Sequence, residues 1–208
     1  MKVAAIVPAY NEEQTIGPVI EALLECQLLS EIIVVSDGSV DRTAEVARQY
    51  PVKVVELAEN IGKGGAMKAG ANHTNCEVLL FVDADLVGLH KEHIEALLEP
   101  VLSGRTAMSV GVFSEGRRST DLAQKLAPSL SGQRAVRKDL FDQVPRLESS
   151  GYGVEVALTQ FAEKHNVDIV RVPLPTVSPI MKEEKRGLVK GLCARMKMYW
   201  EIVRSLRI

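Results

Sequence analysis

The sequence lacks any apolar run near the roughly 18–20 residues that a membrane-spanning helix needs. Its first residues already form a predicted β-strand, so we expect no signal peptide. It also lacks a basic excess, because 25 lysines and arginines face 27 aspartates and glutamates, a formal net charge of -2. A general nucleic-acid-binding protein normally carries a clear positive charge, so we expect no nucleic acid among the partners.

Cysteine is scarce, with three residues that lie far apart and form no C-x-x-C pair: Cys26, Cys76 and Cys193. This odd number and spacing argue against a disulfide framework and against a zinc site. We therefore expect a reducing compartment, the cytoplasm, and three cysteines packed as small buried apolar side chains.

The composition is that of an ordinary globular protein, with 208 residues of which 46% are hydrophobic and 25% charged. This length suffices for one domain with a three-layer core. We expect that domain over residues 1–180, with two halves that meet near residue 105, and a separate segment over residues 181–208.

Short apolar runs alternate with amphipathic stretches in the first half. The predicted strand and helix pairs are 3–7 and 16–24, 32–35 and 44–50, 52–55 and 64–71, and 78–82 and 94–102. Such alternation predicts parallel strand–helix–strand units, and hence an α/β fold: a three-layer α/β/α sandwich around a mostly parallel sheet. Ligands bind such sheets at the carboxyl ends of the strands.

The second half is less regular. We predict strands over 106–113 and 169–172 and a helix over 151–164, with a polar segment after the first strand that contains Arg117 and Arg118. Residues 181–208 carry four lysines and four arginines against three glutamates, with apolar residues at helical spacing. This basic amphipathic helix either packs on the domain or rests on an anionic lipid surface, as a peripheral contact with the inner face of a membrane.

Asp83 and Asp85 follow the most apolar predicted strand. In an extended segment, residues two apart project to the same side, so both carboxylates can face one ligand. Hard oxygen ligands of this kind suit Mg²⁺ or Mn²⁺, which often share their coordination with a substrate diphosphate.

Three more charged residues lie near the ends of predicted strands or helices. Asp37 can cap a turn, or accept hydrogen bonds from a base or ribose. Glu12 can serve as a first-turn acid of a helix, or as a ligand-binding residue. Lys63 lies in a glycine-rich segment that opens a helix, where backbone N–H groups and a lysine favour anions. That segment is not a P-loop, because Gly64 stands where Ser or Thr is required.

In this order the motifs resemble those of the family 2 glycosyltransferases with the GT-A fold. The segments that carry the resemblance are IVPAYNEE (6–13), VSDGSVDRT (35–43), NIGKG (60–64) and DADL (83–86), with a looser likeness over 131–155. The resemblance implies a nucleotide-sugar donor, a UDP- or GDP-sugar, bound by residues 1–105, with an acceptor half over 106–180. It places Pro8, Tyr10, Glu12 and Asp37 around the base and ribose with Lys63 nearby, Asp83 at the ribose or metal, and Asp85 at the metal that bridges the diphosphate.

Sugar transfer expels a nucleoside diphosphate through an oxocarbenium-like transition state, so cations near the leaving group favour it. Arg117, Arg118 or Arg134 could add such charge, and residues 131–135 look like the acceptor-side segment of the family. Glu155 is the candidate catalytic carboxylate, with Glu148 as second choice. Both inverting and retaining chemistry remain open.

Two subfamilies are candidates for this chain, and they predict different acceptors. Polyprenyl-phosphate mannosyltransferases commonly follow the Asp-x-Asp motif with Leu-Gln, whereas this chain has Leu86-Val87. Residues 151–155 (GYGVE) instead resemble sugar-phosphoglycerate synthases. The acceptor is thus a polyprenyl phosphate or a small phosphorylated molecule, and the protein could act as a homodimer.

Two other functions remain open. A nucleotidyltransferase would carry its glycine-rich loop after the first strand, where this chain has Pro8-Ala9-Tyr10-Asn11. A non-catalytic module would bind a nucleotide sugar without turnover, and a substitution at Asp85 would then weaken binding alone.

Overall fold

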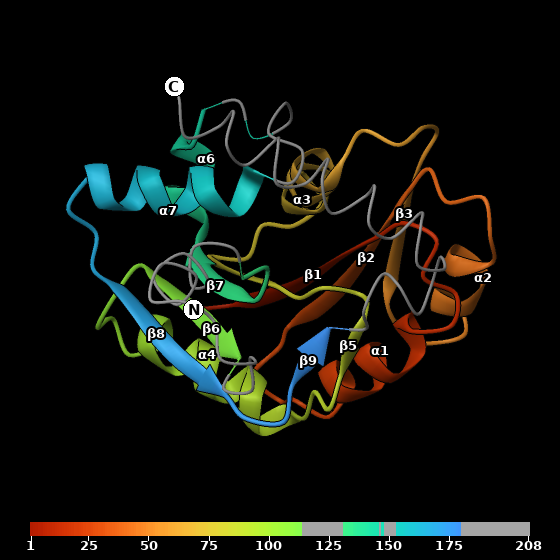
Figure 1. The fold of residues 1–208 in the computed structure, drawn as a ribbon, viewed down its shortest axis with the longest axis horizontal. Helices are drawn as coiled ribbons and strands as arrows, with labels where there is room; N and C mark the ends of the chain where they lie inside the picture. Colours follow the sequence, from red (N-terminus) through yellow and green to blue (C-terminus); the bar gives the residue numbers. More distant parts are fainter. Residues whose placement is uncertain (114–130, 146, 148–152, 180–208) are drawn as a thin grey trace, which may run out of the picture.

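The centre of the molecule is a seven-stranded sheet in the computed structural model, which describes residues 1–113, 131–145, 147 and 153–179 (Figure 1). Its strands are β1 (Val3–Ala9), β2 (Glu31–Asp37), β3 (Lys53–Leu57), β4 (Val78–Phe81), β6 (Met108–Phe113), β7 (Arg134–Arg137) and β8 (Ile169–Leu174). Their order across the sheet is β3-β2-β1-β4-β7-β6-β8. Two short strands, β5 (Leu86–Val87) and β9 (Ser178–Pro179), pair antiparallel in a separate small sheet.

Helices cover both faces of the large sheet (Figure 1). One face carries α3 (Lys63–Asn72), α6 (Lys138–Gln143) and α7 (Val154–Lys164). The other carries α1 (Ile16–Leu24), α2 (Thr43–Ala47) and α4 (Lys91–Leu102). The predicted three-layer α/β/α sandwich is confirmed.

Side chains alternate between the two faces of the sheet and so create two cores. Val3, Ala5 and Val7 of β1 pack toward α1 and α4. Ala4 and Ile6, the residues between them, pack toward α3, α6 and α7. All five side chains are almost fully buried. A strand that is apolar on both faces therefore appears in the sequence as a continuous run, as predicted.

The four predicted strand–helix pairs of the first half are present, and the strands β3, β2, β1 and β4 are mutually parallel. The second helix is shorter than expected, because α2 ends at Ala47 while the prediction extended to Tyr50. After α2 the chain forms turns, in which Gln49 N and Tyr50 N each donate a hydrogen bond to the carbonyl three residues earlier. Pro51 follows directly, and a residue before proline disfavours the helical region.

β7 is an element that the sequence analysis did not predict. It lies between β4 and β6 and runs antiparallel to both. Val136 of β7 pairs with Leu79 of β4, and Ala135 of β7 pairs with Ser109 of β6. The sheet is thus mostly parallel, as expected, with one reversed strand at the junction of the two halves. That strand joins both halves into a single sheet.

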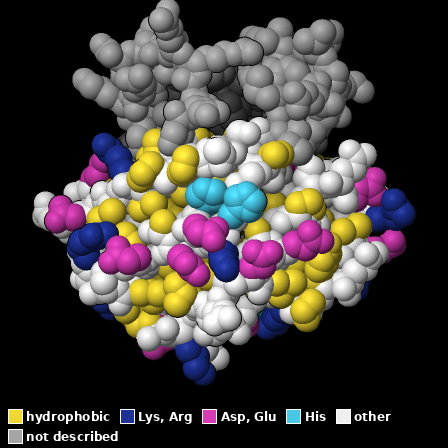
Figure 2. Space-filling model, turned by 90° about the horizontal axis from the view of Figure 1, so that it is seen from below, with side chains coloured by type: hydrophobic (Ala, Val, Ile, Leu, Met, Phe, Trp, Pro, Cys, Tyr) yellow, Lys and Arg dark blue, Asp and Glu magenta, His cyan; other side chains and the backbone are white. Residues whose placement is uncertain are grey.

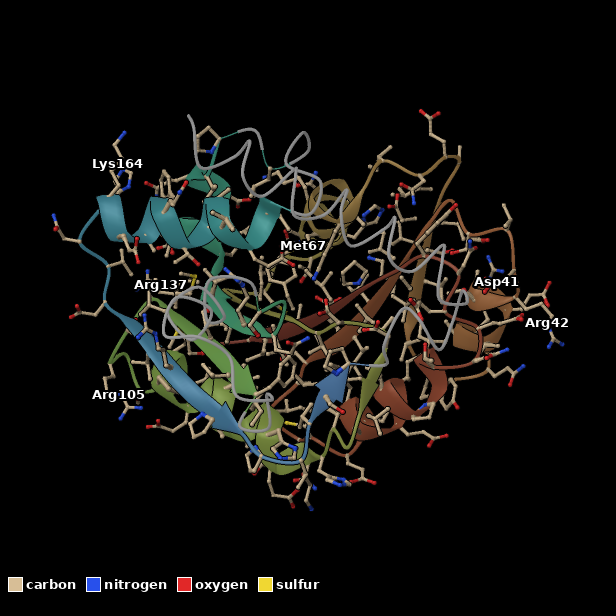
Figure 3. All side chains as sticks on the ribbon, in the orientation of Figure 1. Asp41, Arg42, Met67, Arg105, Arg137 and Lys164 are labelled. Atoms are coloured by element: carbon tan, nitrogen blue, oxygen red, sulfur yellow. The ribbon has the colours of Figure 1, made fainter. Side chains whose placement is uncertain are left out.

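Charged side chains lie mainly at the periphery. Figure 3 shows Arg42, Arg105 and Lys164 at the outer edges of the ribbon, whereas Met67 of α3 lies among the central side chains and is fully buried. On the face seen in Figure 2, two histidines lie side by side among acidic side chains. The stacked pair His90 and His93, with ring centroids 5.8 Å apart, stands at the start of α4.

Cys26 and Cys76 are buried free thiols, and burial raises the pKa of each, as expected for structural cysteines. Cys193 and the predicted basic helix over 181–208 lie outside the described residues. None of the helices in the described part of the chain has the length and apolar character needed to cross a membrane.

Candidate functional site

The loops that follow β1 and β2 interlock at the carboxyl ends of these strands. Asn11 N donates to Ser39 Oγ at 3.2 Å, and Val40 N donates back to Asn11 Oδ1 at 2.9 Å. Glu12 N donates to Thr43 Oγ1 at 2.8 Å. Asn11 has a left-handed backbone (φ 57°), which asparagine tolerates better than most residues. These hydrogen bonds therefore hold the two loops together at the edge of the sheet.

Asp37, at the end of β2, clamps the segment that opens α3. Its two carboxylate oxygens accept hydrogen bonds from Ile61 N at 2.8 Å and Gly62 N at 3.0 Å. Gly62 has a φ of 86°, a conformation that favours glycine. Gly38 lies so close to Glu59 and Asn60 that a Cβ would collide with their backbone. Asp37 thus fixes the position from which Lys63 projects.

Lys63 lies between two carboxylates. Its Nζ is 2.5 Å from Asp83 Oδ1 and 2.5 Å from Glu155 Oε1. The three side chains are 20%, 25% and 7% exposed, respectively. They come from α3, from the loop after β4, and from the first turn of α7. This cluster, the Lys63–Asp83–Glu155 triad, joins the two halves of the chain.

Burial and charge act in opposite directions on the triad. Burial alone would lower the pKa of Lys63, but the carboxylates of Asp83 and Glu155 outweigh it and raise that pKa above its usual range. Burial alone would raise the pKa of Asp83, but the Lys63 ammonium and the Gln133 amide hold it below its usual range. Lys63 is therefore protonated and Asp83 ionised at neutral pH.

Three consecutive residues that the sequence analysis did not assign individually surround Asp83. Gln133 Nε2 donates to Asp83 Oδ2 at 2.8 Å, and Ser131 Oγ donates to Gln133 Oε1 at 3.0 Å. A Cβ on Gly132 would collide with both Asp83 oxygens and with Lys63 Nζ. A neutral amide, a hydroxyl and a glycine carry no charge signal, so only their place in the looser resemblance over 131–155 pointed to them.

Arg134 is fully buried beneath the triad. Its two terminal nitrogens donate to backbone carbonyls, NH1 to Glu155 at 3.1 Å and NH2 to Ser131 at 2.6 Å. Its Nε has no hydrogen-bond partner among the residues that the structure describes. Burial lowers the pKa of Arg134 to about 10, although Glu155 and Asp83 oppose this shift. In this arrangement Arg134 ties the start of β7 to the start of α7, and its predicted contact with substrate stays a prediction.

The remaining predicted residues occupy the same edge of the sheet or lie beyond the described chain. Pro8 lies near the carboxyl end of β1, and the side chain of Tyr10, directly after this strand, is 40% exposed. Glu12 accepts a hydrogen bond from Thr15 Oγ1 at 2.7 Å, but it precedes α1, whose first turn contains no acidic residue, so the first-turn role considered for Glu12 is wrong. Asp85 is half-buried two residues after Asp83. Arg117, Arg118 and Glu148 lie outside the described residues.

The carboxylates present fit a divalent cation that is also bound by substrate. Asp83 and Asp85 provide hard oxygen ligands at the end of β4. Within the described residues, no group of three or more His, Cys, Asp or Glu side chains could hold a metal. A donor set of one or two carboxylates matches Mg²⁺ or Mn²⁺ coordination in which phosphate oxygens and water complete the shell.

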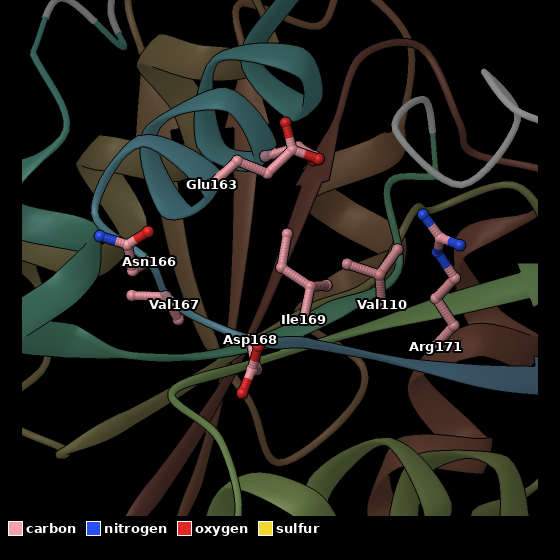
Figure 4. Close-up of a pocket in the computed structure, with 8 residues that line it drawn as sticks. Val110, Glu163, Asn166, Val167, Asp168, Ile169 and Arg171 are labelled. Carbon is pink, nitrogen blue, oxygen red and sulfur yellow. The ribbon is translucent and has the colours of Figure 1, made fainter.

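A cavity that the described residues form lies elsewhere. It measures about 500 Å³ and lies between α7 and the edge strand β8 (Figure 4). Its lining comprises Val110, Thr159, Glu163, Asn166, Val167, Asp168, Ile169 and Arg171. No predicted site residue lines it, so the side-chain contacts and not this cavity locate the candidate site.

Comparison with known proteins gives a consistent result. Residues 4–150 match the sequence model described as glycosyl transferase family 2. The 4,4'-diaponeurosporenoate glycosyltransferase of Staphylococcus aureus strain USA300 is 38% identical over 98 residues, which cover 45% of this chain and 26% of that relative. The chain thus spans about a quarter of the length of this relative.

Solved structures extend the likeness beyond the first half. A structure of glucosyl-3-phosphoglycerate synthase from Mycobacterium tuberculosis with Mn²⁺, UDP and glucosyl-3-phosphoglycerate has a TM-score of 0.80 and 25% identity, and the match covers 99% of this chain and 78% of that one. A second structure of that enzyme, with Mn²⁺, UDP-glucose and phosphoglyceric acid, has a TM-score of 0.71 and 27% identity, with 86% and 71% covered.

Proposed function

Because this chain belongs to glycosyl transferase family 2 and has its GT-A fold, we propose that it transfers a sugar from a nucleoside-diphosphate sugar to an acceptor with the help of a divalent cation. The observation that carries this proposal is the Lys63–Asp83–Glu155 triad, with Asp85 beside it, at the carboxyl end of β4. Open α/β sheets bind ligands at this edge, and the triad draws its residues from both halves of the chain.

The proposed donor site lies on residues 1–105, and the donor is a UDP-sugar. The synthase that resembles this chain over 99% of its length was solved with Mn²⁺ and UDP, which supports uridine. Pro8, Tyr10, Glu12 and Asp37 surround the base and ribose in this proposal. The hydrogen bonds from Ile61 N and Gly62 N to the Asp37 carboxylate support a second role for Asp37, which is to hold Lys63 in position at the site.

Asp85, assisted by Asp83, would hold Mg²⁺ or Mn²⁺. A bound divalent cation supplies positive charge that stabilises the departing diphosphate. Lys63 adds a fixed ammonium beside the same position, and Arg117 and Arg134 are the further cations in the proposal. Because negative charge builds on the diphosphate as it departs from the oxocarbenium-like sugar, such cations stabilise the transition state more than the bound donor.

Glu155 is the proposed catalytic carboxylate of the acceptor half, residues 106–180. It lies in the first turn of α7, and its Oε1 is held by Lys63. This contact keeps the carboxylate at the boundary between the donor and acceptor halves. From there it can orient the reacting hydroxyl of an acceptor.

We propose a small phosphorylated acceptor, because the relatives with solved structures were bound to phosphoglyceric acid or glucosyl-3-phosphoglycerate. The basic segment 181–208, which carries four lysines and four arginines against three glutamates, favours a lipid phosphate as second candidate. Transfer of labelled sugar to 3-phosphoglycerate and to a polyprenyl phosphate distinguishes the two.

The donor class can be tested by thermal unfolding with UDP, GDP, CDP and dTDP, each with and without Mn²⁺. A ligand that binds only the folded state at 100 times its Kd stabilises it by about 2.7 kcal/mol. We expect a Mn²⁺-dependent rise in Tm with UDP. No shift with any nucleotide would contradict the proposal.

Asp85→Asn tests the metal site. The amide keeps the shape but loses the negative charge, so we expect sugar transfer to fall about 100-fold or more and the Mn²⁺-dependent part of the UDP shift to disappear. Asp168→Asn, at an exposed position before β8, is the matched control. It should keep both the rate of sugar transfer and the Mn²⁺-dependent shift in Tm with UDP. In a binding module without turnover, the wild type would bind donor and transfer nothing.

A further inference from the structure

Gln133 is a fully buried amide that contacts the triad from the acceptor half. Its Nε2 donates to Asp83 Oδ2 at 2.8 Å, while Lys63 Nζ holds the other oxygen, Oδ1, at 2.5 Å. Each oxygen of Asp83 thus has its own donor. The plane of this carboxylate is therefore fixed from two sides.

The orientation of the amide is itself determined. Ser131 Oγ, in a side chain that is almost fully buried, donates to Gln133 Oε1 at 3.0 Å. If the amide were reversed, its carbonyl oxygen would face a carboxylate oxygen and repel it. The series Ser131 hydroxyl, Gln133 amide and Asp83 carboxylate thus has a single direction of hydrogen bonding.

The backbone that carries Gln133 is anchored on both sides. Gly111 N, in β6, donates to Gln133 O at 2.8 Å. Arg134 NH2 donates to Ser131 O at 2.6 Å. Between them, Gly132 lies against the Asp83–Lys63 ion pair so closely that a Cβ would not fit. These contacts hold the backbone of Gln133 in place, and with it the amide that contacts Asp83.

We propose that Gln133 is a positioning residue that fixes the orientation of the Asp83 carboxylate, and that it thereby sets the affinity of the site for the divalent cation and the donor diphosphate. This inference rests on the proposed function. Groups that orient the ligands of a metal typically change metal affinity or activity by about 10- to 100-fold when they are removed. Gln133 directly precedes β7 in the acceptor half, so it also makes donor binding depend on the correct placement of that half.

The test compares three variants with the wild type. Gln133→Met keeps an unbranched side chain of similar length but removes both hydrogen bonds. Ser131→Ala leaves the amide in place but removes the hydroxyl that orients it. Thr106→Val is the control, because it removes a buried hydroxyl that bonds to Met108 at the opposite end of β6.

Mn²⁺ binding in the presence of UDP is measured without turnover, from the electron paramagnetic resonance signal of free Mn²⁺. We expect Gln133→Met to weaken Mn²⁺ binding by about 10- to 100-fold and Ser131→Ala to weaken it by less. The double variant should match Gln133→Met, because the hydroxyl acts only through the amide. In the transfer assay, the KM for Mn²⁺ should rise while the KM for acceptor stays unchanged.

Wild-type Mn²⁺ affinity in folded Gln133→Met would overturn the inference, as would an equal loss in Thr106→Val. If Gln133→Met does not fold, Gln133→Asn replaces it, since its amide is one methylene too short to reach Asp83. Weakened Mn²⁺ binding in Gln133→Asn supports the inference and normal binding refutes it. A wild-type protein that neither binds UDP with Mn²⁺ nor transfers sugar refutes the proposed function itself.

Discussion

The ammonium of Lys63 is the cation that two carboxylates from different halves of the chain share. Asp83 and Glu155 each approach Lys63 Nζ to 2.5 Å, and all three side chains are largely removed from water. A partly buried ion pair contributes little net stability by itself, because desolvation offsets the attraction. Removal of one member is costly, however, because it leaves the other charges unpaired.

Lys63→Met should therefore destabilise the protein at pH 7 by about 3 kcal/mol or more, the usual cost of breaking a buried pair. Lys68→Met is the matched control in the same helix. Lys68 pairs with Asp142 at 2.9 Å, but the two side chains are 25% and 40% exposed, so the loss should be about 1 kcal/mol or less. Urea unfolding of the two variants measures both values, and equal losses would contradict the role assigned to Lys63.

The difference between Lys63→Met and the wild type should also depend on pH. In the wild type the pKa of Asp83 lies below that of the unfolded chain, about 3.9, so its stabilising contribution exists above that pH and is lost on acidification. Without Lys63, burial raises the pKa of Asp83, and stability then falls as the pH rises. The gap between the variant and the wild type should thus widen from pH 3 to pH 7.

The sequence identified the charged members of the site but not the residues that orient them. Asp37, Lys63 and Asp83 are marked by their place at strand or helix ends, and Glu155 by the family resemblance. Gln133, just before β7, is marked only by its place in the looser resemblance over 131–155, since a neutral amide by itself resembles any surface polar residue. Its significance depends on a contact across 50 residues of sequence, which periodicity cannot reveal.

At the scale of elements, buried parallel strands and amphipathic helices were predictable because their apolar patterns are long. The predicted runs at 3–7 and 78–82 correspond to β1 and β4, within a residue or two at each end. β7 and α6 were not predicted. The strand is four residues long with arginine at both ends, and the helix is six residues long, so neither contains enough residues to establish a period.

The segment that opens α3 depends on one side chain of β2. In Asp37→Ala, the N–H groups of Ile61 and Gly62 lose their buried acceptors, which should cost about 1–3 kcal/mol. Hydrogen exchange at these two amides should accelerate more than exchange in α4. Asp139→Ala, which removes the acceptor of Leu140 N at the start of α6 and the ion-pair partner of Arg137, is the control and should leave exchange at Ile61 and Gly62 unchanged.

At the scale of the whole molecule, one sheet with two cores makes the halves interdependent. β7 pairs with β4 of the first half and β6 of the second, so neither half completes its sheet alone. On one face the two halves also share a core, in which the rings of Phe81 and Phe141 have centroids 5.0 Å apart. The described chain should therefore unfold as one cooperative unit.

Phe141→Ala should lower the Tm of a single calorimetric transition without splitting it. Phe141 is fully buried, and loss of such a ring leaves a cavity that costs about 3–5 kcal/mol. Leu28→Ala, at a side chain that is 44% exposed, serves as the control and should change Tm little. Two separate transitions in Phe141→Ala would show that the halves unfold independently.

The placement of the triad across the junction near residue 105 has a consequence for protein engineering by recombination. Lys63 and Asp83 lie before that crossover point, whereas Gln133 and Glu155 lie after it. A chimera that exchanged the second half for that of a relative would inherit the ammonium and one carboxylate, but would receive their partners from a different parent. Compatible parents can therefore be chosen from these four positions before any library is built.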